Sequence, residues 1–248
     1  MIGGVIERAW QILSRWAVPV MMTLAYALLA ATSETDMTGK AWMAVGLGFV
    51  LVAWFVFRRL TEAAALARAL SVGDTARLLA LADRHLSRKR RPAARAPFLV
   101  ARAFAHLLRG ELSEAVAVIE AARPGPELQP LAAAVKIGAL VELGRPAAEA
   151  RAVVMIRAPR APALAWLAEG QIAWRDHQLD AAAQRFARVI DDVRAGSAIR
   201  AIAHVYAARI AEARGEAAIA TRHRATAATL ATPEATWLRG QGTRSPIG

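Results

Sequence analysis

The chain has 248 residues, of which 56% are hydrophobic, with a mean hydropathy of +0.30 and a formal net charge of +12. It is too apolar for a disordered chain, and long enough for one or two domains with a core. The absence of cysteine excludes disulfides, thiolate zinc sites and a cysteine nucleophile. Only Lys40, Lys89 and Lys136 are lysines. Such an arginine- and alanine-rich composition is typical of a GC-rich genome, so the charge alone is weak evidence for nucleic-acid binding.

Two uncharged apolar stretches, 16–32 and 41–57, lie near the N-terminus. As helices of about 17 residues each they would be roughly 25 Å long, close to the lower limit for a bilayer core. We expect a transmembrane helical hairpin over 16–57, preceded by a cytoplasmic or interfacial segment at 1–15. A cleaved signal peptide ending near Ala25-Tyr26-Ala27 is the alternative for the first stretch.

Charge on either side of these stretches predicts the orientation. The short loop carries Glu34 and Asp36 against Lys40 alone, whereas Arg58 and Arg59 directly follow the second stretch. Residues 1–57 have no net charge, while 58–95 carry ten basic and three acidic residues, a net +7. Because positive charge favours the cytoplasmic side, we expect a two-pass protein of a bacterial inner membrane with both termini in the cytoplasm.

From residue 58 to 231 the sequence predicts a cytoplasmic array of helices without strands. The clearest helix is Gln178–Val193, where apolar residues recur at steps of three and four. Five turn residues recur at spacings of 37, 34, 33 and 38, namely Gly73, Gly110, Gly144, His177 and Gly215. We therefore expect about five helical hairpins, followed by a disordered tail at 232–248 in which Trp237 and Leu238 are candidates to cap the last hairpin.

A helix-turn-helix period near 34 residues resembles the tetratricopeptide repeat. In the unit around His177, Trp166 and Gly170 fall where the family has a large and a small residue on the first helix of its repeat. Ala182 and Phe186 fall where it has a small and an aromatic residue on the second helix. Seven prolines lie near the boundaries between units: Pro92, Pro97, Pro124, Pro126, Pro159, Pro162 and Pro233. The resemblance implies an all-α solenoid in which stacked units form one cooperative right-handed arc. Another helical-hairpin solenoid is the alternative.

In tetratricopeptide arrays the first helix of each unit lines a concave groove, so the resemblance also implies a partner-binding surface. It would hold an amphipathic helix or an apolar peptide, with Trp174 as an anchor and two arginines pairing with acidic groups. The alternative is that these side chains are ordinary core. The candidate groove residues are Val100, Phe104, Leu107, Val141, Leu167, Gln171, Trp174, Arg175 and Arg209.

A basic cluster follows the first predicted hairpin and enters the Pro92 loop. It consists of Arg84, Arg88, Lys89, Arg90, Arg91 and Arg95. We expect contact with anionic lipid headgroups, with a solvated loop as the alternative. Nucleic acid is disfavoured, because no aromatic stacking residues accompany the charge.

Motifs for catalysis, cofactors and metals are missing from the sequence. There is no phosphate-binding glycine loop with its lysine, no His-Glu-x-x-His and no Gly-x-Ser-x-Gly. The five histidines are assigned to different hairpins and lack metal-ligand spacing. We therefore expect no enzymatic activity, no cofactor and no bound metal.

Together these features predict a membrane-anchored scaffold or adaptor that recruits partner proteins. Its layout, with two N-terminal membrane helices before tetratricopeptide-like repeats, is similar to that of the HemY family. The similarity extends to layout alone, so it implies no role in haem metabolism. One alternative is an accessory subunit of a transport or secretion complex, since small residues on the apolar helices leave room for a partner helix. Another is a membrane-tethered binder of anionic polymer or nucleic acid.

Overall fold

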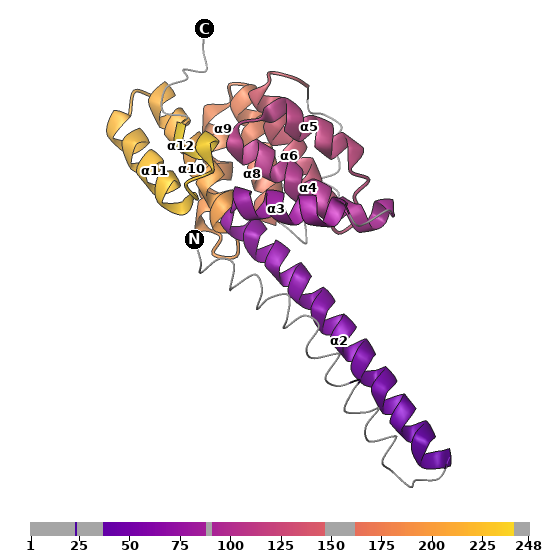
Figure 1. Cartoon of the computed structure of the whole chain (residues 1–248). Helices are drawn as coiled ribbons and strands as arrows, with labels where there is room; N and C mark the ends of the chain where they lie inside the picture. Colours follow the sequence, from indigo (N-terminus) through magenta and orange to yellow (C-terminus); the bar gives the residue numbers. More distant parts are fainter. Residues whose placement is uncertain (1–22, 24–36, 88–90, 147–161, 241–248) are drawn as a thin grey trace, which may run out of the picture. The chain divides into compact units, whose positions relative to one another are not determined.

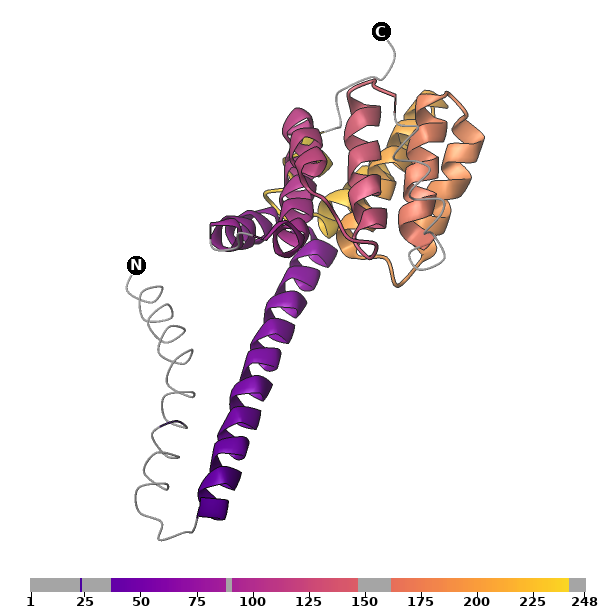
Figure 2. The ribbon, with the colours of Figure 1, turned by 90° about the vertical axis from the view of Figure 1, so that its right-hand side faces the viewer.

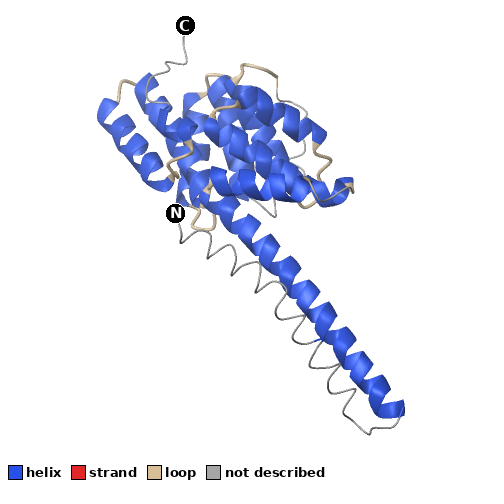
Figure 3. Cartoon of the chain, viewed as in Figure 1, coloured by secondary structure: helices blue, strands red, loops and turns tan. Residues whose placement is uncertain are grey.

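A computed structural model of the chain describes residues 23, 37–87, 91–146 and 162–240, with side chains described for Thr23 and from Val45 onward. All secondary structure in this part of the chain is helical, as predicted (Figure 3). The chain divides into two compact units, residues 1–65 and 66–248.

The first long helix, α2 (Met37–Val72), contains the whole of the second predicted apolar stretch, 41–57. Between Val45 and Leu60 it exposes large apolar side chains, among them Phe49 at 74% and Phe57 at 66%. Among the described residues no helix is both long and apolar enough to span a membrane. The segment 1–15 and, apart from Thr23, the stretch 16–32 lie outside the described residues, as do the side chains of 41–44.

The second unit begins with the last residues of α2 and continues as a series of helices in which successive neighbours pack on one another (Figures 1 and 2). Helices also contact the next but one along the chain, as α4 does with α6 and α8 with α10. The helices are α3 (Thr75–Leu86), α4 (Pro92–Arg109), α5 (Leu112–Ala121), α6 (Gln129–Glu142), α8 (Pro162–Arg175), α9 (Leu179–Asp191), α10 (Ser197–Ala213), α11 (Ala217–Leu230) and α12 (Thr236–Gly240).

The five predicted turn residues are confirmed as helix ends. Gly73, Gly110, Gly144, His177 and Gly215 are the described residues with left-handed φ, between +58° and +78°. The next residue in each case donates its backbone N–H to the carbonyl five positions earlier, as Glu111 does to His106 at 2.9 Å. This is the bond of a Schellman cap, which satisfies the last carbonyls of a helix while the chain reverses.

The predicted helix at 178–193 is confirmed as α9, which buries Ala182, Phe186 and Val189. Gly170 on α8 lies against Phe186, whose ring is 2.8 Å from the place a Cβ would occupy. Val193 does not share the apolar face, because the helix has ended and its side chain is 88% exposed. Pro97 lies inside α4 rather than between units, where it forfeits one helical hydrogen bond.

The ends of the second unit meet, so the helices form a closed array rather than an open arc. The Ser197 hydroxyl donates to the carbonyl of Ser71 at 3.2 Å. A Cβ on Gly196 would lie 2.7 Å from the same carbonyl oxygen, so the approach requires glycine. Thr232 donates to the carbonyl of Gly73 at 3.0 Å, a contact across 159 residues.

The C-terminal segment is ordered further than predicted. Residues 236–240 form α12, which packs on α4, α10 and α11, and Trp237 and Leu238 are each 5% exposed. The prediction of a disordered tail from 232 is therefore wrong up to residue 240, because these apolar side chains find a surface within the closed array. Residues 241–248 lie outside the described part of the chain.

Candidate partner-binding site

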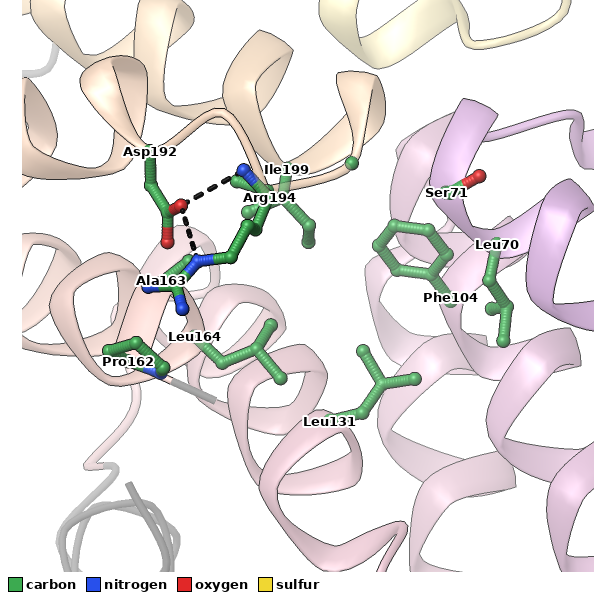
Figure 4. A pocket seen from close by; sticks show the side chains of 12 residues that line it. Leu70, Ser71, Phe104, Leu131, Pro162, Ala163, Leu164, Asp192, Arg194 and Ile199 are labelled. Carbon is green, nitrogen blue, oxygen red and sulfur yellow. Dashed lines mark hydrogen bonds and ion pairs between the residues drawn. The ribbon is translucent and has the colours of Figure 1, made fainter. Parts of the chain in front are cut away.

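An apolar pocket of about 430 Å³ opens where several helices of the closed array converge (Figure 4). Leu70 of α2 and Phe104 of α4 form one side, and Leu164 of α8 and Ile199 of α10 lie across from them. Leu131, near the start of α6, lies below the gap between them. Except for Phe104, these large apolar side chains are half-buried, so the pocket presents apolar surface to an entering group.

The turn between α9 and α10 supplies the polar edge of this pocket. The Asp192 carboxylate accepts from the backbone N–H of Arg194 at 2.9 Å and from its Nε at 3.3 Å. The Arg194 side chain is 79% exposed whereas that of Asp192 is 8% exposed. The pair therefore fixes the turn and places the exposed guanidinium of Arg194, already paired with Asp192, at the edge of the apolar cavity.

The predicted groove residues lie in the core instead of lining an open surface. Of the nine, only Arg175 is half-exposed, and Trp174 is 9% exposed. Their burial contradicts an open groove at these positions, and α12 packs on α4 and α10, two of the helices that were expected to line it. The buried members are Val100, Phe104, Leu107, Val141, Leu167, Gln171, Trp174 and Arg209.

A polar cluster forms at the centre of these buried residues. Arg209 donates twice to the Glu142 carboxylate, at 2.7 and 3.0 Å, and the Tyr206 hydroxyl donates to the same carboxylate at 2.5 Å. Burial, reinforced by the neighbouring Glu142, raises the pKa of Tyr206 well above its usual value. Arg209 is thus committed to an internal ion pair and is not available to an acidic partner.

Sequence reasoning missed the pocket, apart from Phe104. Its other lining residues come from the end of α2, the beginnings of α6, α8 and α10, and one turn. Periodicity marks the face of one helix and says nothing about how the ends of separate helices meet. The nearest signal was the turn-like Asp-Val-Arg-Ala-Gly sequence at 192–196.

The predicted lipid-contacting cluster is only partly described. Arg91 and Arg95 are exposed and Arg84 is half-exposed, and no ion pair joins any of them to a carboxylate in the described part of the chain. Arg88, Lys89 and Arg90 lie outside the described residues. Lipid contact therefore stays a prediction.

Two histidines that were assigned to different hairpins share one. His204 on α10 and His223 on α11 place their Nδ1 atoms 2.9 Å apart. Burial, with His223 and Arg200 nearby, lowers the pKa of His204 to about 4, and burial together with Arg222 lowers that of His223. Among the described residues there is no group of three or more metal-ligating side chains.

No protein-family model, curated protein or solved structure matches the chain.

Proposed function

We propose that the chain is a membrane-anchored adaptor that holds a partner protein through the apolar pocket of its closed helical array. The observation that carries this proposal is the convergence of α2, α4, α6, α8 and α10 on one half-open apolar cavity. Apolar anchors seated in such cavities contribute most of the affinity in many protein interfaces. On this proposal the protein acts by binding a partner.

The pocket fits one or two large apolar side chains from a partner helix or turn. A buried leucine or phenylalanine gains about 1.5–3 kcal/mol on leaving water, which is enough for an anchor residue. The exposed guanidinium of Arg194 at the mouth favours a partner with a carboxylate next to its apolar anchor.

The membrane anchor rests on the sequence of 41–57 and on the side chains of α2. The uncharged stretch 41–57 of α2 exposes Phe49, Val52 and Phe57, a surface suited to lipid. Two arginines follow it, with Arg58 over the ring of Trp54 at 5.6 Å and Arg59 over that of Phe55 at 5.0 Å. Aromatic and arginine side chains combined in this way are typical of the headgroup level. In a two-pass anchor, the other transmembrane helix would be formed by residues 16–32.

Site-specific photocrosslinking in native membranes tests the pocket. A crosslinking amino acid at Leu164 should capture a discrete partner, whereas one at Ile219, an exposed position on α11 outside the pocket, should not. Leu131→Arg should abolish the Leu164 product, because it places a charge inside the cavity. Equal capture from both positions would refute the pocket as the docking site.

Fractionation tests the anchor separately. The protein should remain with membranes after alkaline carbonate extraction, and a C-terminal reporter should give a cytoplasmic signal. Release into the carbonate supernatant would remove the anchor from the proposal and leave the pocket untouched.

A further inference from the structure

The turn between α9 and α10 presents an exposed apolar side chain beside the pocket. Val193 stands between Asp192 and Arg194, which line the cavity, but its own side chain does not line it and is 88% exposed. In the described part of the second unit, the exposed large apolar side chains are those of Val72, Val193 and Ile219. Val72 directly follows another lining residue. The exposed apolar surface of this unit is therefore concentrated next to the pocket in the chain, as at an interaction site.

The same turn carries charges of both signs. Asp191 is exposed two positions before Val193, and no basic side chain in the described part of the chain pairs with it. Arg194 directly follows Val193, and its Nε donates to Asp192 while the side chain stays 79% exposed. A guanidinium has further N–H donors, so Arg194 can also bind a second carboxylate. An apolar anchor near a carboxylate, which is the partner chemistry that the pocket favours, thus occurs in this chain itself.

Because the anchor and the pocket adjoin one turn, a two-fold arrangement can satisfy both at once. An isologous contact brings the same patch of two copies together, so each turn meets the pocket of the other copy. Val193 would then enter an apolar cavity of about 430 Å³, and Asp191 would face Arg194 of the other copy. The anchor is already exposed and the cavity is open to solvent, so neither has to be uncovered first.

We propose that the partner held by the pocket is a second copy of this chain, with Val193 of each copy as the anchor in the pocket of the other. This inference rests on the proposed function, since it names the occupant of the same site. It makes the protein a two-fold dimer in which each array fills the pocket of its partner.

Disulfide cross-linking between two differently tagged full-length chains tests the contact. The chain has no cysteine, so one copy carries only Val193→Cys and the other only Leu164→Cys, inside the pocket. Mild oxidation in the cell fraction that contains the protein should join the two tags. In the control, Ile219→Cys, exposed on α11 outside the pocket, takes the place of Val193→Cys and should give at least about tenfold less product.

Sedimentation of the purified full chain in detergent gives a second measurement that does not alter the pocket. The unaltered chain should have the mass of two copies. Val193→Asp should have the mass of one copy, because a carboxylate cannot enter an apolar cavity unpaired. The exposure of this side chain leaves the fold intact, which circular dichroism checks. Asp191→Lys should raise the dissociation constant of the dimer at least about tenfold, whereas Glu216→Lys, another exposed acid, should leave it unchanged.

Equal cross-linking from positions 193 and 219 would overturn the proposal, as would an unaltered chain that sediments as one copy. Photocrosslinking at Leu164 separates this failure from failure of the proposed function. A product with the mass of two copies supports both. A product that contains a different protein overturns the second copy as the occupant and keeps the pocket as a docking site. Absence of any product overturns both.

Discussion

Arg209 and Glu142 are 67 residues apart in the sequence and form a two-pronged ion pair inside the array. Their side chains are 8% and 11% exposed, so both charges have left water. The pair links α6 to α10, and Tyr206 donates to the same carboxylate. A buried pair of this kind is costly to break, because the surviving charge stays in the interior.

Glu142→Ala should therefore destabilise the protein by about 3–5 kcal/mol in denaturant unfolding. The variant leaves Arg209 charged and both it and Tyr206 without their acceptor. Asp180→Ala is the matched control, since Asp180 also pairs with an arginine but is 98% exposed; it should cost at most about 1 kcal/mol. Similar losses of unfolding free energy in the two variants would show that the Glu142 carboxylate is hydrated in the folded protein and not buried.

Gly196→Ala should disturb the closure of the array. A Cβ at this position would lie 2.7–2.8 Å from backbone atoms of Ser71, which cannot rotate away as a side chain can. We expect a loss of about 1–3 kcal/mol in thermal unfolding. Gly125→Ala, where no heavy atom lies within 4 Å, should be nearly neutral, and equal effects would argue against the closed form.

Stability should fall as the pH decreases from about 6.5 to about 4. Since the pKa of His204 is lowered to about 4, the folded state binds fewer protons than the unfolded state in this range. The contribution of neutral His204 to the free energy of unfolding is thus complete above pH 6.5 and is lost as the pH falls through the lowered pKa. Because His204 is partly exposed, we expect only about 1 kcal/mol. Between pH 7 and pH 4, the free energy of unfolding should fall by less in His204→Gln than in the unaltered protein. An equal fall in both proteins would contradict the lowered pKa of His204.

Neighbouring residues of α8 allow a direct comparison of core and surface. Trp174→Ala should cost about 3–5 kcal/mol, since the side chain is 9% exposed within the core cluster. Arg175→Ala should cost less than about 1 kcal/mol, because its ion pair with Asp176 is near the surface. A small loss for Trp174→Ala, together with weaker partner capture, would restore the open-groove interpretation.

Much of the local structure could be read from the sequence. Gly73, Gly110, Gly144 and Gly215 were identifiable as corners because glycine adopts left-handed φ without a steric penalty. His177 was found only through its spacing from the glycines. The face of α9 followed from apolar residues at helical steps, ending where Val193 leaves the helix. Such features depend on residues within a few positions of one another.

The arrangement of the hairpins could not be read in the same way. Closure depends on Gly196 meeting Ser71 and Thr232 meeting Gly73, contacts across more than a hundred residues that leave no local pattern. Trp174 and Arg209, which the sequence placed in a groove, are buried in the array, and the pocket lies at the helix ends instead. The sequence was enough to locate the corners between helices and the apolar face of α9, because propensity and capping act locally. Which apolar faces are covered depends on the tertiary structure, since distant segments compete for the same surface.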